Sequence, residues 1–242
     1  MSDAPVALVS GGATGIGAAC AKRLSAEGFR IALHYRSSAE KAKKLLAELP
    51  DAFGLQADLT VSGEVDALIK EIKAEAGRVD VLVNNAGYNV NAPMLTMSLE
   101  QYDSVAAVAR GTWYLSKLVL RRFMFRAGVG RIVNISSVVG HTGNPGQVPY
   151  TMVKAGLDAF TKSVSQEVAG KDILVNSVAP GFIDTDMTQN LPEDVKAAIL
   201  AKIPQGRMGT VEEVADVVAF LTTRGSYVNG TVIHVNGGMY GG

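Results

Sequence analysis

The chain has 242 residues, enough for one domain with a substantial core and too few for a large second domain. Apolar residues make up 48% and charged residues 19% of the sequence, a composition that excludes an intrinsically disordered chain. Lysine plus arginine and aspartate plus glutamate each number 23, so no net field attracts nucleic acid or an anionic membrane. Any recognition of charge must therefore be local.

The single cysteine, Cys20, cannot form an intrachain disulfide and has no Cys/His spacing typical of a zinc site. We therefore predict no metal site and expect a reducing, cytoplasmic setting. No signal peptide precedes the first apolar run, and no apolar stretch reaches the roughly 18 residues of a membrane-spanning helix. We expect a soluble protein with neither a membrane nor a nucleic acid as partner.

Short apolar runs alternate with segments of helical periodicity along the chain. The runs predict buried strands at 6–9, 31–33, 79–83, 131–135, 173–178 and 231–235. Between the first two runs, Ile16, Ala19, Cys20 and Leu24 recur at helical spacing. This alternation predicts βαβ units, and hence an α/β fold: a single domain over 1–242 with a doubly wound parallel sheet and helices on both faces. Ligands of such sheets lie outside the carboxyl ends of the strands.

The loop after the first run, 10–17, is rich in glycine and leads into a helical segment. Its glycines let the backbone turn tightly and approach a pyrophosphate, whose charge the free N–H groups at the helix start would bind. The spacing Gly-x-x-x-Gly-x-Gly differs from the Gly-x-Gly-x-x-Gly dinucleotide fingerprint, and a glycine turn without a ligand is the alternative. The position after the first strand favours a phosphate-binding loop. Its cofactor residues would be Gly11, Thr14, Gly15, Ile16 and Gly17.

The second run is followed by Tyr35 and Arg36, at the place where a dinucleotide-binding fold distinguishes its cofactors. An acidic residue there would bind the ribose 2′-hydroxyl of NAD, whereas an arginine favours the 2′-phosphate of NADP. Tyr35 and Arg36 therefore predict NADP. The alternative is that Arg36 is an ordinary solvated charge.

Tyr150 and Lys154 are four residues apart in a helical segment, a spacing that places both side chains on one face. A cation near a phenol favours the phenolate, so Lys154 would make Tyr150 a usable proton donor or acceptor near neutral pH. Ser137, which follows a predicted strand, would hold the substrate oxygen. A surface Tyr/Lys pair with no catalytic role is the alternative.

In their order and spacing, these motifs resemble the short-chain dehydrogenase/reductase family over essentially the whole chain. The landmarks are 11–17, Asp58-Leu59, 84–87, Ser137, Tyr150-x-x-x-Lys154 and 180–185. The resemblance implies a Rossmann-type domain that transfers hydride from NADPH to a ketone. Tyr150 would donate the proton, Lys154 would bind the nicotinamide ribose and lower the phenol pKa, and Ser137 would orient the carbonyl. The further cofactor-binding residues implied are Asp58, Leu59, Asn85, Ala86, Gly87, Pro180, Gly181, Ile183 and Thr185.

Within the family, the stretches 138–140, 180–187 and 235–239 are most similar to the 3-oxoacyl-(acyl-carrier-protein) reductases of fatty-acid synthesis. This similarity implies reduction of a 3-oxoacyl thioester linked to acyl carrier protein or CoA, with specificity in a substrate loop at about 182–210. A short-chain alcohol or sugar dehydrogenase is the alternative.

The resemblance also implies partners. It implies a homotetramer that assembles through a helix bundle and the C-terminal strand. A basic patch of Arg121, Arg122, Arg126 and Lys171 is a candidate site for an acidic carrier protein, with a solvated charged face as the alternative.

The segment 105–113 departs from the family pattern. The family usually has an asparagine in this helix that supports the lysine through a water in a proton relay. Counting back from Gly111 places Val108 at that position, and counting forward from Tyr102 places Ala109 there, so the segment is one residue short. Natural divergence, engineering and a missing residue all fit this difference. A catalytically impaired NADP-binding protein is therefore a further alternative.

Overall fold

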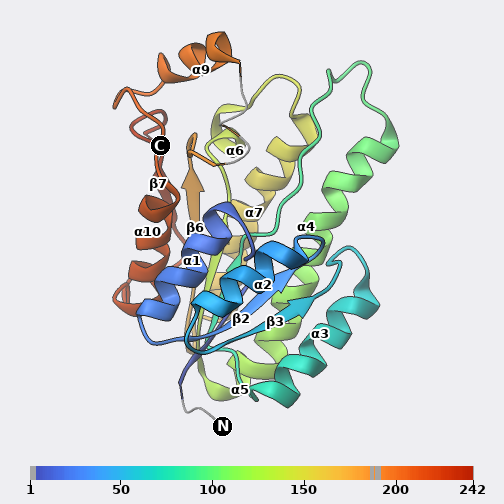
Figure 1. The fold of residues 1–242 in the computed structure, drawn as a ribbon, viewed down its shortest axis with the longest axis vertical. Helices are drawn as coiled ribbons and strands as arrows, with labels where there is room; N and C mark the ends of the chain where they lie inside the picture. Colours follow the sequence, from blue (N-terminus) through green and yellow to red (C-terminus); the bar gives the residue numbers. More distant parts are fainter. Residues whose placement is uncertain (1–3, 186–187, 189–191, 242) are drawn as a thin grey trace.

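The computed structural model describes residues 4–185, 188 and 192–241, and its described strands form one parallel sheet (Figure 1). The strands are β1 (Val6–Val9), β2 (Arg30–Tyr35), β3 (Ala52–Gln56), β4 (Val81–Asn84), β5 (Val129–Ile135), β6 (Asp172–Pro180) and β7 (Val232–Val235). Their order is β3-β2-β1-β4-β5-β6-β7, with every neighbouring pair parallel. The predicted doubly wound, Rossmann-type α/β fold is confirmed.

One strand, β3, has no counterpart among the predicted apolar runs. It lies at the edge of the sheet, and Leu55 is its only fully buried residue. It also contains Gly54, and glycine is depleted in strands. A half-covered edge strand therefore lacks the continuous apolar run that marks the central strands.

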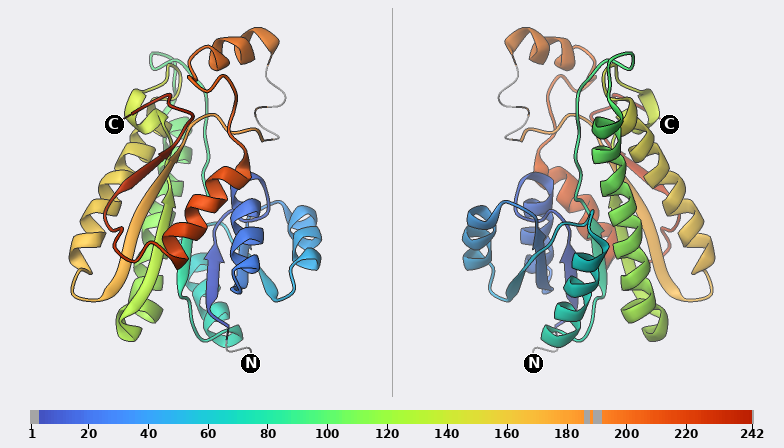
Figure 2. Two further views of the ribbon diagram at one scale, coloured as in Figure 1. Left: turned by 90° about the vertical axis from the view of Figure 1, so that its left-hand side faces the viewer. Right: turned by 90° about the vertical axis from the view of Figure 1, so that its right-hand side faces the viewer.

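Helices cover both faces of the sheet (Figure 2). One face carries α1 (Gly15–Ala26), α2 (Ala39–Glu48) and α10 (Val211–Thr223), and the other carries α3 (Ser62–Glu75), α4 (Leu99–Val119) and α7 (Val148–Glu167). Each layer has its own apolar core, with Leu24 and Val218 buried on the first face and Ile72 and Leu115 on the second. No helix among the described residues is long and apolar enough to cross a membrane.

Within the described ranges, four shorter helical segments join or extend these elements. A π-helical turn (Leu120–Met124) and α5 (Phe125–Ala127) extend α4 to the start of β5, α6 (Val139–Thr142) follows β5, and α9 (Glu193–Leu200) lies between β6 and α10.

Two of the long helices, α4 and α10, begin at side-chain caps. Ser98 and Gln101 form a reciprocal capping box at the start of α4, and Thr210 and Glu213 form one at the start of α10. Arg207 binds Glu213 at 2.6 Å and, with the backbone of Thr210, lowers the pKa of that carboxyl to about 2. The segment before α10 is thereby tied to the helix that follows it.

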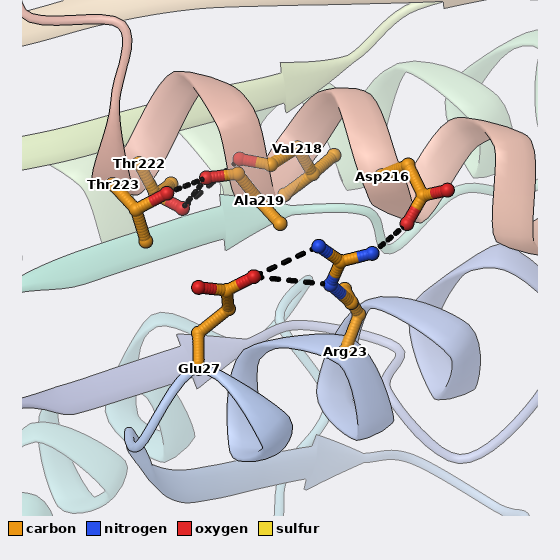
Figure 3. A network of polar contacts seen from close by, with 7 residues as sticks. All are labelled: Arg23, Glu27, Asp216, Val218, Ala219, Thr222 and Thr223. Atoms are coloured by element: carbon orange, nitrogen blue, oxygen red, sulfur yellow. Dashed lines mark hydrogen bonds and ion pairs between the residues drawn. The ribbon is translucent and has the colours of Figure 1, made fainter.

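The first and last long helices pack side by side although they are almost 200 residues apart in the chain. Figure 3 shows Arg23 of α1 between Glu27, the residue that follows this helix, at 2.8 Å, and Asp216 of α10. In α10, the hydroxyls of Thr222 and Thr223 donate hydrogen bonds to backbone carbonyls of the preceding turn. Because α1 starts in the glycine loop, this packing also fixes the position of that loop.

Candidate active site

A cavity of about 630 Å³ opens at the carboxyl ends of the strands, where the strand order reverses between β1 and β4. A ligand site is expected at this place in a doubly wound sheet. The sequence-predicted residues that line it are Gly11, Thr14, Ile16, Tyr35, Arg36, Asp58, Leu59, Asn85, Ala86, Gly87, Ser137, Tyr150, Lys154 and Pro180. The predicted residues that are not part of its lining are Gly15, Gly17, Gly181, Ile183 and Thr185.

Three of these five residues, Gly15, Gly17 and Thr185, belong to the glycine loop or lie near it without lining the cavity. A Cβ at Gly17 would lie 2.3 Å from the carbonyl oxygen of Gly11, so the loop can close on the helix start only with glycine there. Gly11 and Gly15 both have positive φ, which disfavours other residues. Thr185 lies near Gly15, with its methyl carbon 3.7 Å from the place of a Cβ. These contacts support the shape of the glycine loop from behind.

His34 holds the glycine loop, although its role was not predicted from the sequence. Its Nδ1 accepts a hydrogen bond from the N–H of Gly11 at 3.1 Å, and its Nε2 lies 2.9 Å from the carbonyl oxygen of Ala57. This pattern requires the neutral ring with its proton on Nε2. Burial lowers the pKa of His34, which keeps the ring neutral. The only signal in the sequence is a polar residue within an apolar strand.

Ser10 and Asn85 join the glycine loop to the loop after β4. The Ser10 hydroxyl accepts hydrogen bonds from the N–H groups of Asn85 and Ala86 at 3.0 and 3.1 Å. The Asn85 amide donates to the carbonyls of Ser10 and Gly11. A Cβ at Gly11 would lie 3.0 Å from the Cα of Ala86, so the two loops are in close backbone contact. The result is a rigid, concave backbone surface of the kind that holds a pyrophosphate.

The end of the cavity beside β2 holds one basic and one acidic side chain, Arg36 and Asp58. The half-exposed guanidinium of Arg36 lies 3.9 Å from the carboxylate of Asp58. Burial alone would raise the pKa of Asp58, but hydrogen bonds from Thr60 and the charge of Arg36 lower it overall. Arg36 therefore keeps a charged partner and remains accessible at the cavity. These features fit a dinucleotide whose adenosine end carries a 2′-phosphate.

Ser137, Tyr150 and Lys154 meet at the other end of the cavity. Lys154 donates a hydrogen bond to the carbonyl oxygen of Ile135 at 2.7 Å, and its ammonium lies 5.5 Å from the ring centroid of Tyr150. Burial lowers the pKa of Lys154 to about 8. Burial raises the pKa of Tyr150, and a hydrogen bond with Ser137 opposes this rise. The triad predicted from the sequence is brought together.

The pKa of Tyr150 is raised overall. The predicted lowering of the phenol pKa by Lys154 remains a prediction, because the direction found here is set by burial and by Ser137. The physical reason for the rise is that burial disfavours the charged phenolate more than the surroundings stabilise it. Tyr150 is therefore held protonated at neutral pH, which suits a proton donor.

A buried polar network fixes the elements behind Lys154. The amide of Asn84 donates to Asn134 and to Ser116 of α4, both at 2.8 Å. The amide of Asn134 donates to Thr161 of α7 at 2.7 Å, and Thr161 contacts Ser177 at 2.8 Å. The network thus joins strands β4, β5 and β6 to helices α4 and α7. Polar residues inside the predicted apolar strands were its only signal in the sequence.

The α4 helix is continuous through the segment where an asparagine was expected. Val108 lines the main cavity together with Tyr150 and Lys154, so an isopropyl group occupies this side of the site. A second, largely apolar cavity of about 420 Å³ lies between α4 and α7 and is lined by both Val108 and Ala109, together with Tyr150 and Lys154. Of the two candidate positions, only Val108 lines both cavities, and it is also the position obtained by counting back from Gly111.

The residues of the basic patch lie near the amino ends of the strands, whereas the cavity lies at the carboxyl ends. Arg121, Arg122 and Arg126 are exposed in the segment before β5, and the Lys171 ammonium lies 4.5 Å from the centroid of the Phe125 ring. This segment precedes the amino ends of β5 and β6, whereas Tyr150 lies at the carboxyl ends. In Figure 1, α5 lies at the bottom and α6 near the top. The patch therefore does not border the cavity of its own chain.

The predicted substrate loop, about 182–210, includes α9, which lies beyond the carboxyl ends of the strands in Figure 1. Ile183 pairs with Gly209, and the N–H of Asp184 donates to the carbonyl of Gly209 at 2.8 Å, so the loop is closed at its base. Residues 186–187 and 189–191 lie outside the described part of the chain.

The fold and site together define a dinucleotide-dependent oxidoreductase with a Ser/Tyr/Lys centre, and the family comparison agrees. The family model described as enoyl-(acyl carrier protein) reductase matches residues 11–240, and the chain belongs to this family of short-chain dehydrogenases/reductases. Among individual proteins, it is 41% identical over 240 residues to the 3-oxoacyl-(acyl-carrier-protein) reductase FabG of Staphylococcus aureus, with 97% of each chain covered. It is 44% identical over 242 residues to the FabG of Aquifex aeolicus, again with 97% of each chain covered. The FabG of Haemophilus influenzae is 42% identical over 238 residues, covering 97% of this chain and 98% of that one.

Proposed function

We propose that this protein reduces a 3-oxoacyl thioester, linked to acyl carrier protein or CoA, to the 3-hydroxyacyl form with NADPH. The observation that carries the proposal is the meeting of Ser137, Tyr150 and Lys154 in a cavity that the glycine loop also lines. NADPH, when bound, supplies the hydride for the ketone carbon. The similarity to several 3-oxoacyl-(acyl-carrier-protein) reductases over nearly the whole chain supports this substrate class.

The side chains at the triad suit protonation of a carbonyl oxygen. The Ser137 hydroxyl would donate a hydrogen bond to this oxygen and so orient the ketone. The Tyr150 hydroxyl would then donate its proton to the same oxygen as negative charge develops there. The raised pKa of Tyr150 keeps that proton in place at neutral pH. Lys154, anchored on Ile135, would bind the nicotinamide ribose.

The proposed NADPH site extends from this triad to Arg36. Tyr35, Arg36, Asp58 and Leu59 would bind the adenosine end, with Arg36 on the 2′-phosphate. The pyrophosphate would lie on the glycine loop, and the loop after β4 would support the nicotinamide end. The remaining proposed contacts are those of Pro180, Gly181, Ile183 and Thr185 after β6.

A substrate panel tests this function. We expect NADPH consumption with an acetoacetyl thioester, and slower turnover with NADH, with an enoyl thioester and with alcohol or sugar substrates run in the oxidising direction.

Tyr150→Phe should lower kcat by about 10²- to 10⁴-fold and leave NADPH affinity nearly unchanged, because only the transferred proton is lost. Tyr227→Phe, at a fully exposed tyrosine, is the matched control. An unchanged rate in Tyr150→Phe would contradict the assigned role. In the substrate panel of the wild-type protein, a preference for an alcohol or sugar would instead support a short-chain alcohol or sugar dehydrogenase.

A catalytically impaired NADP-binding protein is the second candidate, and Val108 is the observation that favours it. Its side chain offers no hydrogen bond where the family usually has an amide. Retained NADPH binding with no turnover of any panel substrate at any pH would establish this alternative.

We also propose that the chain forms a homotetramer in which an acidic carrier protein binds at Arg121, Arg122, Arg126 and Lys171. Exposed apolar residues on α4 and α7, namely Tyr102, Trp113 and Met152, support a helix-bundle interface. The edge strand β7 is only half-buried along its length, which supports a second interface there. The cytoplasmic location and the single domain over 1–242 with its substrate loop remain predictions.

A further inference from the structure

Asp158 is a buried carboxylate that the mechanism above does not use. It lies on α7 one helical turn beyond Lys154, which is itself one turn beyond Tyr150, so the three side chains follow one face of the helix. The residue is 4% exposed, and neither carboxylate oxygen accepts a properly aligned hydrogen bond from any residue that the structure describes. Burial of a charge in this way is unfavourable unless a cation compensates it.

The groups that face Asp158 come from three elements besides its own helix. The Nε2 of His141, from α6, lies 3.0 Å from a carboxylate oxygen of Asp158, a close contact but not an aligned hydrogen bond. The His141 ring packs against His234 of β7, at 4.7 Å between centroids, and against Tyr240 after β7, at 5.1 Å. The charge of Asp158 raises the pKa of His234, although burial and His141 together lower it overall.

Lys154 is likewise a buried charged group, of the opposite sign to Asp158. The residue is 6% exposed, and the only hydrogen-bond acceptor of its ammonium within the described chain is the neutral carbonyl of Ile135. Burial lowers its pKa, and the charge of Asp158 is the influence that opposes this. On the α4 side of the ammonium, Val108 supplies no polar group. No ion pair within 4.0 Å joins Lys154 and Asp158 in the described chain, but the two buried groups lie one turn apart on the same face of α7, and the charge of Asp158 acts on Lys154 at this longer range.

We propose that Asp158 is a positioning residue of the active site, whose carboxylate, packed against His141, keeps the ammonium of Lys154 charged in the absence of a polar group from α4. The proposal rests on the catalytic role proposed for Lys154. Asp158 is thus expected to determine the pH at which Lys154 loses its proton, and this pH can be measured without turnover of any substrate.

The direct test is a titration of Lys154 in the full-length protein. Lysines labelled with ¹³C next to the amine are followed by NMR, and the Lys154 signal is identified by its loss in Lys154→Arg. In Asp158→Asn, Lys154 should lose its proton at a pH lower by about one unit, because the amide keeps the shape but removes the charge. Asp172→Asn is the matched control: it removes the same charge from an exposed pair with Arg131 at the opposite edge of the sheet. This control should leave the Lys154 titration unchanged.

Two further variants keep the test decisive. Asp158→Glu retains the charge and should retain a titration near that of the wild type. Asp158→Ser is a smaller neutral replacement with the same expected shift, for use if the asparagine variant does not fold. An unchanged Lys154 titration in a folded neutral variant would overturn the proposal.

The pH profile supplies the functional readout. In Asp158→Asn, the alkaline decrease of kcat should move to lower pH by the same amount as the Lys154 titration, while KM near pH 6 should change little. A kcat lowered equally at every pH would indicate a merely structural role and contradict the proposal. If the wild-type protein turns over no substrate, the proposed function fails, but the titration still decides whether Asp158 sets the charge of Lys154.

Discussion

Tyr150 and Lys154 respond to the same burial in opposite directions. Burial raises the pKa of the phenol and lowers that of the ammonium to about 8. Reduction needs the phenol protonated and the ammonium charged, and both conditions hold below about pH 8. As the pH rises, Lys154 loses its proton first, since the raised pKa keeps the proton on Tyr150.

We therefore expect kcat/KM for reduction to fall as the pH rises through about 8, where Lys154 titrates. Lys154→Arg provides the check, because a guanidinium stays charged throughout this range. Its overall rate should be lower, but the alkaline decrease near pH 8 should disappear. Stopped-flow or steady-state rates between pH 5.5 and about 9.5 measure the profile. The same decrease in the arginine variant would mean that another group titrates.

At the scale of single residues, the sequence predicted those side chains whose roles depend on local spacing. Tyr150 and Lys154 are one helical turn apart, so their shared face follows from helix geometry alone. His34 and Asp158 act through contacts with residues on other elements, 23 residues away for Gly11 and 17 for His141. Such contacts depend on the completed fold, and a lone polar residue in an apolar segment does not reveal its partner.

At the scale of elements, the continuous helix α4 determines whether the missing asparagine is better restored by insertion or by substitution. Gly111 lies against the loop after β3, where a Cβ would come within 2.2 Å of the carbonyl oxygen of Leu59. An asparagine inserted after Val108 would move Arg110 to the place of Gly111 and create a steric clash. Substitution at Val108 avoids this change of helix register.

We expect Val108→Asn to raise kcat by less than about tenfold, since Asp158 already supports Lys154 and one neutral hydrogen bond contributes about 1 kcal/mol. Val108→Ala is the control, because it opens the same space without an amide. Rates at saturating substrate and NADPH compare the two variants. A gain in the alanine variant as large as that in the asparagine variant would show that space, not hydrogen bonding, limits the rate.

The elements themselves were predictable where burial is complete. The five central strands of the described sheet are covered on both faces, and a continuous apolar run marked each of them. The edge strand β7 also has such a run, although it is only half-buried. The edge strand β3 lacks this cover. The packing of α1 on α10 also had no local signal, because Arg23 and Asp216 meet only when both helices lie on the same face of the sheet (Figure 3).

At the scale of the whole molecule, the parallel sheet separates the cavity from the basic patch in space. All the strands have their carboxyl ends at one edge, which brings loops from across the chain into a single cavity. This convergence was predictable from the alternation of strands and helices. The basic patch lies at the amino ends, and the sequence did not reveal that it faces away from the cavity. A carrier protein bound there would deliver its substrate to a neighbouring subunit of the proposed tetramer.

This arrangement predicts that the basic patch affects only carrier-linked substrates. We expect Arg122→Glu combined with Arg126→Glu to raise KM for a carrier-linked 3-oxoacyl substrate at least about tenfold, through repulsion of an acidic partner. KM for the uncharged N-acetylcysteamine thioester should not change, because the patch does not line the cavity. Added salt should weaken the carrier-linked reaction of the wild type and reduce the difference between the proteins. Lys43→Glu, on the exposed surface of α2, is the matched charge reversal and should leave both KM values unchanged. Equal losses with both substrates in the double variant would show that the arginines support the fold or the assembly and do not bind the carrier.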